Sequence, residues 1–113
     1  MSARREVAAR MAEAAARLVE ALDDTQRAEA VWSFPSDAER RSWFYTPTDH
    51  GGLPLGRMTP PQQRMAFQLM ATGLSMAGYV TATTIIGLEN VLDRVEGFNA
   101  SWGRPRGRDP QLY

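Results

Sequence analysis

Apolar side chains recur at helical spacing in the first part of the chain. Between residues 3 and 22 they repeat every three or four positions and share one face of a predicted helix: Val7, Met11, Ala14, Leu18 and Leu22. Alanine, the strongest helix former, is abundant in the same segment. Asp23 and Gln26 then spell a capping box for a short second helix that ends near Trp32. The pattern therefore predicts N-terminal helices over residues 3–32.

Residues 59–97 show a second helical pattern. Thr59 and Gln62 form a capping box, with Pro60 at the first helical position, so a helix is expected to begin there. Gly73 interrupts it, Ser75 caps a further helix over 76–96, and Gly97 is its expected stop. The apolar stripe of this last helix comprises Ala77, Thr81, Ile85, Leu88, Leu92 and Val95, widened by Val80, Ile86 and Val91. So broad a stripe predicts a helical hairpin whose last helix is buried on more than one side.

The stretch between these regions reads as an aromatic and loop segment over residues 33–58. A capping-box spelling at 36–39 predicts one helical turn at 37–41. Residues 42–46 are rich in aromatic side chains and stop at Pro47, which predicts a short extended segment. Residues 98–113 are rich in glycine and proline and predict an irregular tail. We therefore expect a mainly α fold, with residues 1–113 forming one helical subdomain.

Composition narrows the possible functions. Basic and acidic residues balance to a net charge of zero, which removes the electrostatic case for nucleic acid or an anionic membrane as partner. The chain has no cysteine, so disulfides, thiolate metal sites and a cysteine nucleophile are excluded. His50 is the only histidine, which excludes a metal site built from several histidines. No apolar run is long enough for a transmembrane helix or a signal peptide, and a cytoplasmic location is expected.

The strongest candidate for ligand contact is a cluster of arginine and aromatic residues. Arg41, Trp43 and Tyr45, with Arg40 beside them, fall in the predicted extended segment, where alternate side chains share a face. Tryptophan and tyrosine combine apolar area with a polar group, and a guanidinium can grip a carboxylate or phosphate. The alternative, which we favour, is that the aromatic side chains fill the core and the arginines cover its rim.

Four weaker candidates each have a simpler interpretation, which we prefer. His50 can serve as an acid or base, but a solvated turn explains it. Glu89 and Asp93 can pair as carboxylates, but a charged helix face that also includes Arg94 and Glu96 explains them. Residues 99–101 spell a glycosylation sequon that lacks a secretory signal. Residues 103–108 resemble a basic RNA-contacting tract, but a loop is the better interpretation. We predict no catalytic residue and no metal ligand, and no cofactor is indicated.

Several ordered blocks of sequence resemble one known family. They are WSF (32–34), ERRSWFYTP (39–47), GLPL (52–55), MTPPQ (58–62), LSMAGY (74–79), IIGLENVL (85–92) and RDPQLY (108–113). Together they resemble the domain-of-unknown-function family 3500, although Asp49 and His50 stand where the family tends toward basic and proline residues. Family members continue into a second part with a Gly-Trp-rich segment and a paired-histidine stretch. The resemblance thus implies a truncated chain: the helix-rich N-terminal piece of a larger, bacterial-type α+β protein.

Three functional hypotheses follow, and whether the intact protein is an enzyme stays open. In the first, this helical subdomain packs against and shapes a C-terminal half that the chain lacks, or self-associates through its apolar helix faces. In the second, Arg41, Trp43 and Tyr45 line the substrate pocket of a hydrolytic or metal-dependent enzyme. In the third, the chain is a stand-alone helical interaction module. None of the three involves nucleic acid or a membrane.

Overall fold

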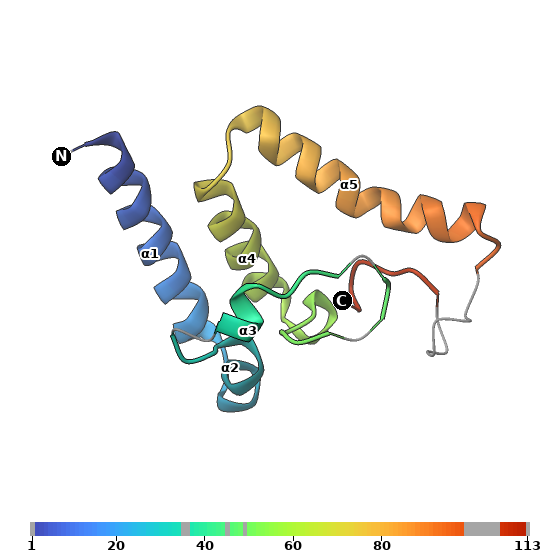
Figure 1. Cartoon of the computed structure of the whole chain (residues 1–113), viewed down its shortest axis with the longest axis horizontal. Helices are drawn as coiled ribbons and strands as arrows, with labels where there is room; N and C mark the ends of the chain where they lie inside the picture. The colour runs from blue at the N-terminus through green and yellow to red at the C-terminus, as the bar shows by residue number, and fades with distance from the viewer. Residues whose placement is uncertain (1, 35–36, 45, 49, 99–106, 113) are drawn as a thin grey trace.

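The protein is a chain of helices without a sheet in the part described. The computed structural model describes residues 2–34, 37–44, 46–48, 50–98 and 107–112. In chain order its elements are α1 (Ala3–Ala21), α2 (Asp24–Ala30), α3 (Asp37–Arg40), the 3-10 turn η1 (Leu55–Arg57), α4 (Pro60–Thr72) and α5 (Met76–Val95) (Figure 1). The mainly α prediction is confirmed. Residues 42–44 and 46 form no strand, because no neighbouring strand among the described residues offers them a ladder.

Side-chain caps set the beginnings of the helices where the sequence predicts them. The Asp23 carboxylate accepts from the Gln26 backbone N–H at 2.8 Å, and the Gln26 side-chain oxygen accepts from the Asp23 N–H at 3.0 Å. Thr59 and Gln62 repeat this reciprocal arrangement at the start of α4. The Ser75 hydroxyl oxygen caps α5. These polar pairs satisfy N–H groups that a helix start leaves without an internal partner.

The end of α5 is also fixed locally. Gly97 has φ +72°, a left-handed conformation that glycine adopts without steric cost. The Gly97 N–H donates to the Arg94 carbonyl at 3.0 Å, and the Phe98 N–H donates to the Asp93 carbonyl at 2.8 Å. This is the Schellman arrangement that commonly ends an α-helix. The predicted stop at Gly97 is confirmed.

The two capping boxes meet at one corner of the molecule, which we call the glutamine corner (Gln26 and Gln62). The Gln26 amide donates to the Gln62 side-chain oxygen at 2.8 Å, and the Gln62 amide donates to that of Gln26 at 3.0 Å. The Gln62 amide also donates to the Ala21 carbonyl at the end of α1, and the Gln26 amide to the Arg57 carbonyl of η1. Gln62 is only 8% exposed. The corner therefore ties α1, α2, η1 and α4 together through polar bonds, most of which are partly buried.

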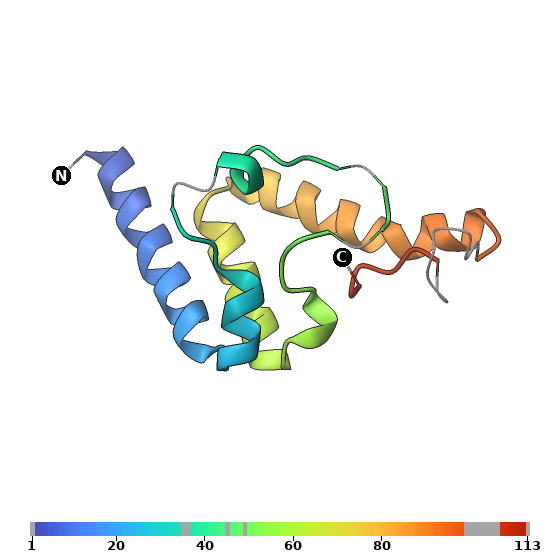
Figure 2. The same ribbon diagram turned by 60° about the horizontal axis from the view of Figure 1, so that its bottom comes forward.

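Helices α1 and α4 lie side by side and form the one extensive helix–helix contact between described elements (Figures 1 and 2). Ala14 and Leu22, both from the predicted stripe of α1, are each 3% exposed and form the buried hydrophobic core of the described residues. Val7 and Leu18 of the same stripe are half-buried. The amphipathic pattern of α1 thus correctly identifies its packed face, although the interior it covers is small.

Helix α5 lies apart from this pair. It contacts α4 only sparsely and then diverges from it, so the hairpin expected over 59–97 is open (Figure 1). The prediction that the last helix is buried on more than one side is wrong, because no residue of α5 is buried. The radius of gyration, 15.7 Å, exceeds the value of about 13 Å expected for a compact domain of this length. The extended placement of α5 accounts for this excess.

Candidate functional site

A segment near the end of the chain, which we call the tail segment (residues 107–112), holds α5 to the rest of the molecule. On the α5 side, the Arg108 backbone N–H donates to the Asp93 carboxylate at 2.9 Å. On the other side, the Gly56 N–H of η1 donates to the Gln111 carbonyl at 2.8 Å. The tail segment therefore bridges two elements that barely touch each other directly.

The contact at Gly56 depends on the absence of a side chain. A Cβ atom placed there would lie 2.7 Å from the Gln111 carbonyl oxygen, closer than real Cβ atoms approach backbone. The Gln63 amide strengthens the same junction by donating to the Leu55 carbonyl at 2.7 Å and to the Gln111 side chain at 3.1 Å. Glycine at position 56 is thus what lets the tail segment approach η1.

Arg108 joins the tail segment to two acidic residues of α5. Its Nε lies 2.5 Å from a Glu96 carboxylate oxygen, and its guanidinium donates to Glu89 at 3.2 Å. Its side chain is only 16% exposed. The hydrogen bond to Glu96, helped by that to Glu89, raises the pKa of the Arg108 guanidinium above its ordinary value, while burial opposes the rise. Arg108 is a permanently charged tether between the tail segment and α5.

The acidic residues of α5 therefore have a different role from the one predicted. Glu89 and Asp93 do lie on a charged side of α5 with Glu96, but the tail segment covers this side and Arg108 bonds to both residues. They do not act as a pair of free carboxylates, since each already accepts a hydrogen bond. This network was not predictable from local sequence patterns, because Arg108 lies far along the chain from Glu89.

The opposite side of α5 is apolar and bare. We call it the α5 face; it comprises Ala77, Val80, Thr81, Thr84, Ile85, Leu88, Val91, Leu92 and Val95, all exposed. The exposed fractions of Leu88, Val91 and Val95 are 50%, 53% and 76%. No charged residue interrupts this face at helical spacing. Helix α5 thus turns Glu89 and Asp93 inward, together with the half-buried Tyr79 and Ile86. It turns most of its apolar side chains to solvent, which reverses the usual amphipathic arrangement over that face.

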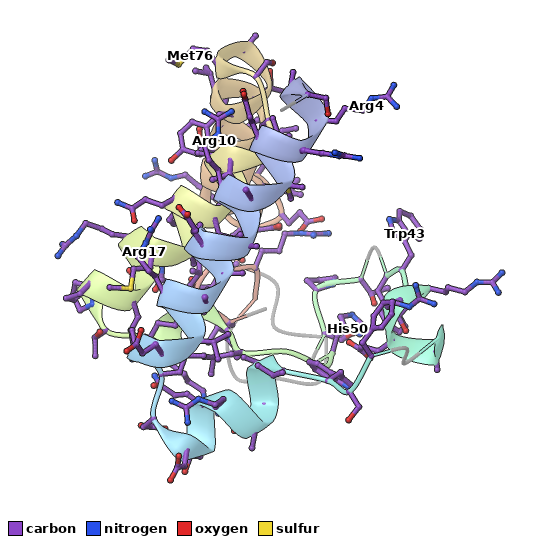
Figure 3. The ribbon with its side chains drawn as sticks, turned by 90° about the vertical axis from the view of Figure 1, so that its left-hand side faces the viewer. Arg4, Arg10, Arg17, Trp43, His50 and Met76 are labelled. Carbon is purple, nitrogen blue, oxygen red and sulfur yellow. The ribbon has the colours of Figure 1, made fainter. Side chains whose placement is uncertain are left out.

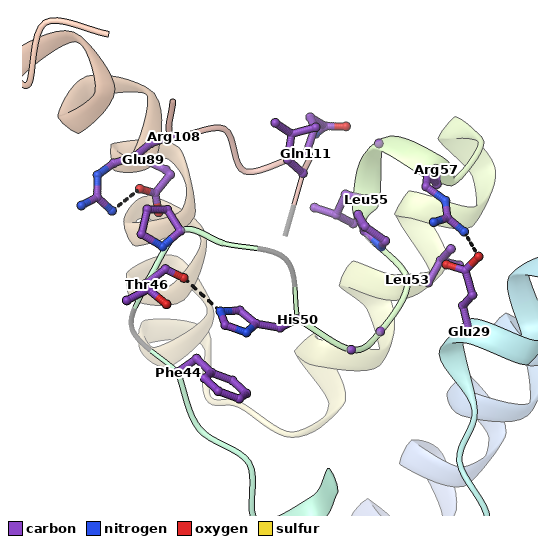
Figure 4. Close-up of a pocket in the computed structure, with 16 residues that line it drawn as sticks. Glu29, Phe44, Thr46, His50, Leu53, Leu55, Arg57, Glu89, Arg108 and Gln111 are labelled. Carbon is purple, nitrogen blue, oxygen red and sulfur yellow. Dashed lines mark hydrogen bonds and ion pairs between the residues drawn. The ribbon is translucent and has the colours of Figure 1, made fainter. Parts of the chain in front are cut away.

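A pocket of about 880 Å³ lies between the loop before η1, the tail segment and α5 (Figure 4). Its lining includes His50, Arg57, Glu89 and Arg108. Figure 4 shows the basic groups engaged with carboxylates, because Arg57 pairs with Glu29 and Arg108 pairs with Glu89. The positive charges of the lining are therefore already balanced by protein groups.

His50 is the titratable ring of this pocket. Its ring stacks on Phe44, with centroids 3.9 Å apart and planes 12° from parallel. Nε2 donates to the Thr46 carbonyl at 3.1 Å, since that oxygen can only accept, and it lies 3.2 Å from the Thr48 hydroxyl. The expectation of a solvated turn is wrong, because His50 is half-buried and held in the loop. The signal that could have indicated this is Phe44, an aromatic side chain six residues earlier.

Two of the predicted binding residues, Arg41 and Trp43, lie on the loop just before Phe44, which lines the pocket. Trp43 is 77% exposed and Arg41 is also exposed, while Phe44 between the predicted positions lines the pocket. Figure 3 shows Trp43 projecting outward from the loop. The interpretation of Trp43 as a core residue is wrong, because the small interior lies between α1 and α4 and the loop runs outside it. The binding role of Arg41 and Trp43 stays a prediction, and Tyr45 lies outside the described residues.

Other sequence candidates have mixed outcomes. Arg40 places its guanidinium 5.1 Å from the centre of the Phe34 ring, a cation–π contact. The sequon at 99–101 and most of the basic tract at 103–108 lie outside the described residues.

Among the residues described, no group of three or more histidine or acidic side chains could hold a metal ion. Within the same ranges, no helix combines the length and apolar character required to span a bilayer.

Comparison with protein families assigns nearly the whole chain to one of them. Residues 4–111 match the family described as "Protein of unknown function (DUF3500)". The match confirms the resemblance drawn from the ordered sequence blocks, and it extends that resemblance to α1. Comparisons with curated proteins and with solved structures gave no match.

Proposed function

Since the chain belongs to the DUF3500 family, a family of unknown function, we propose that it is a helical docking subdomain whose α5 face binds another folded polypeptide. The α1–α4 pair and the glutamine corner form the base of this unit. The tail segment sets the orientation of α5 on that base. The function is therefore to present one long apolar helix face in a defined direction.

The reversed polarity of α5 carries this proposal. A helix that packs only within its own domain buries its apolar stripe and exposes its charges. In α5, Glu89 and Asp93 are held against the tail segment, while Leu88 and Val91 face solvent. The bonds of Arg108 hold the helix in this orientation, so a rotation that buried the apolar side would break them.

Covering the α5 face would contribute substantial free energy. Full burial of a valine or leucine side chain stabilises by about 1.5–3 kcal/mol relative to exposure. Soluble monomers rarely leave continuous apolar patches of this kind uncovered, and such patches commonly mark sites of protein contact. A neighbouring surface that covers Leu88, Val91 and Val95 would therefore be favoured over water.

Two occupants of the α5 face follow from the sequence. One is the C-terminal half of a longer, bacterial-type α+β protein, which this subdomain would pack against and shape. The other is a second copy of the chain. Either arrangement suits a cytoplasmic protein that needs neither nucleic acid nor a membrane. The docking proposal concerns the face itself and holds for both occupants.

Two adjacent positions allow a matched test of the face. Val91 lies on it, whereas Asn90 is exposed on another side of the same helix. We expect Val91→Asp to abolish both the binding of a hydrophobic dye and any concentration-dependent association, because it places a charge within the apolar surface. Asn90→Asp, which adds the same charge, should leave both properties unchanged. Dye fluorescence and sedimentation velocity measure them.

The docking proposal fails if the wild-type chain neither binds the dye nor associates. It also fails if the two aspartate variants behave alike, because the effect would then come from charge alone. Circular dichroism of both variants checks that α5 remains helical. We expect equal helicity, since Val91 is more than half exposed and contributes little to the interior.

A second candidate function is that the pocket belongs to the substrate site of a hydrolytic or metal-dependent enzyme. The observation that favours it is the pocket of about 880 Å³ beside the predicted binding segment. Arg41, Trp43 and Tyr45 would contact the substrate at the rim. The stacked ring of His50 would form part of the wall.

Substitution at the rim tests this second candidate. A ligand found by thermal-shift screening should lose most of its affinity in Trp43→Ala, measured by calorimetry. The melting temperature without ligand should hardly change, because Trp43 is 77% exposed and surface substitutions usually stay within about 0.5 kcal/mol. Affinity that survives both Trp43→Ala and Arg41→Ala would rule this site out.

A further inference from the structure

The α5 face carries a regular repeat along its centre. Its central positions are separated by alternating steps of four and three residues: Ala77, Thr81, Thr84, Leu88, Val91 and Val95. Repeats of this kind keep one seam of a helix directed at a partner helix over its whole length. Continuous pairing with a single helix therefore fits the face better than contact at one end.

Side-chain size changes along this seam. The first half has small residues, Ala77, Thr81 and Thr84, and the second half has larger ones, Leu88, Val91 and Val95. A partner that fills the seam evenly must be large where α5 is small and small where α5 is large. A second copy of α5 in antiparallel orientation has this property, because its second half then lies opposite the first half of α5.

We propose that the occupant is a second copy of this chain, docked so that the two α5 helices run antiparallel about a two-fold axis level with residue 86. In this register Ala77 faces the partner's Val95, Thr81 faces the partner's Val91, and Thr84 faces the partner's Leu88. The Ala77–Val95 and Thr84–Leu88 layers then each combine a smaller and a larger side chain, while Thr81 and Val91 are nearly equal in size. The inference rests on the docking role proposed above and names its partner.

A parallel pair fits the seam less well. It would place Ala77, Thr81 and Thr84 against their own copies and would leave the first half of the interface underfilled. Voids of this kind forfeit dispersion contacts and weaken an interface. The gradient of side-chain size therefore selects the antiparallel orientation.

The area of contact is sufficient for a specific dimer. Helix α5 has 20 residues, so it is about 30 Å long, and half of the side surface of a helix of that length is about 500 Å². Two copies would bury about 1,000 Å² in total, at the lower limit of specific protein interfaces. We therefore expect a dimer that dissociates on dilution.

The Thr84 hydroxyl and the Arg94 guanidinium do not oppose this arrangement, while the Thr81 hydroxyl would have to turn to a backbone carbonyl one helical turn earlier. The Thr84 hydroxyl already donates to the Val80 carbonyl at 2.7 Å, so burying it leaves no donor without a partner. Arg94, the exposed charge nearest the seam, would stand sixteen residues along the axis from its own copy. That separation is about 24 Å, well beyond the screening length in physiological salt.

Analytical ultracentrifugation of the wild-type chain and two arginine variants tests the dimer. Leu88 lies on the seam beside the two-fold axis, and Leu88→Arg would bring two like charges into the apolar contact. We expect this variant to raise the dissociation constant by about 100-fold or more. Asn90→Arg adds the same charge to an exposed position outside the face and should keep the wild-type constant.

Thiol crosslinking tests the register. The chain has no cysteine, so single cysteines can be introduced without background. A mixture of Ala77→Cys and Val95→Cys chains, treated with a short bifunctional thiol reagent, should give mainly the mixed dimer. Ala77→Cys alone should crosslink poorly, because its copies lie at opposite ends of the pair.

The outcomes separate this inference from the docking role. Efficient crosslinking of Ala77→Cys alone would indicate a parallel pair and overturn the register. A wild-type chain that stays monomeric at all concentrations overturns the self-pairing, yet leaves the docking role standing if the chain still binds hydrophobic dye. A monomer that binds no dye overturns both.

Discussion

The glutamine corner and α5 hold their places in opposite ways. At the corner, Gln26 and Gln62 exchange two hydrogen bonds in a half-buried to buried setting and tie four elements together. In α5, a long apolar helix leaves Val91 and Val95 in solvent and is held at its far end by the charged bonds of Arg108. The polar residues of the glutamine corner hold the helices together, whereas the apolar residues of the α5 face remain exposed to contact another surface.

This contrast shows where the stability of the chain lies. Burial of apolar area usually dominates folding, but here Ala14 and Leu22 form the buried hydrophobic core of the described residues. Most of the apolar surface of α5 contributes nothing until something covers it. We therefore expect changes at the corner to unfold the protein and changes on the α5 face to affect only its associations. The following substitutions test that division.

The largest effect is expected at the corner itself. Gln62→Ala would remove the bonds to Gln26 and Ala21 and the cap on Thr59, and would leave buried groups without partners. We expect a loss of about 3 kcal/mol in the free energy of unfolding, measured by urea denaturation. Gln68→Ala, an exposed glutamine on the same helix, should change it by less than about 0.5 kcal/mol. Equal effects of the two variants would contradict the view that the glutamine corner determines the stability of the chain.

A smaller loss is expected where the tail segment meets η1. Gly56→Ala would bring a methyl group against the Gln111 carbonyl oxygen, so one backbone must move. We expect the free energy of unfolding to fall by about 1–2 kcal/mol. Amide exchange should become faster at Gly56 and Arg108, whose N–H groups hold the tail segment, while exchange in α1 stays unchanged. Faster exchange throughout the chain would mean that the tail segment supports more than α5.

Gly87→Ala is the matched control for this glycine. A Cβ atom at Gly87 would meet nothing within 4 Å, and the residue lies inside α5. Alanine is about 1 kcal/mol more favourable than glycine in a helix interior. The substitution should therefore stabilise α5 and slow its amide exchange, the opposite of the change at Gly56.

The smallest loss is expected from Arg108→Gln. The glutamine keeps some capacity for hydrogen bonds but cannot pair electrostatically with Glu89 and Glu96. Because these groups are mostly covered, we expect the free energy of unfolding to fall by about 1 kcal/mol. This is more than for a fully exposed ion pair. Amide exchange should rise in α5 alone. Arg64→Gln, at an exposed position of α4, should have no measurable effect.

The helices were predictable because their signals are local. Each capping box lies within four consecutive residues, and the stripe of α1 repeats at a spacing that only a helix satisfies. Helix starts at Asp24, Pro60 and Met76 follow directly from Asp23, Thr59 and Ser75. A single sequence contains this information without any knowledge of tertiary contacts.

The glutamine corner and the tail segment were not predictable, because they depend on long-range meetings. Gln26 and Gln62 each read as the last residue of a capping box, and nothing in that motif says that two of them face each other. Trp43 and His50 were misjudged for the same reason: aromatic content indicates burial, but only the path of the loop decides which ring is covered. The breadth of the apolar stripe on α5 was recognised and led to the hypothesis of docking through apolar helix faces, but the expectation that the helix is buried on more than one side was wrong.

The reciprocal amide bonds of the glutamine corner join neutral groups, whereas the Arg108 bonds join full charges. Dissolved ions screen charges and leave amide pairs nearly untouched. Raising the ionic strength is therefore expected to loosen the attachment of α5 more than the α1–α4 base, by an amount that the covered position of Arg108 keeps small.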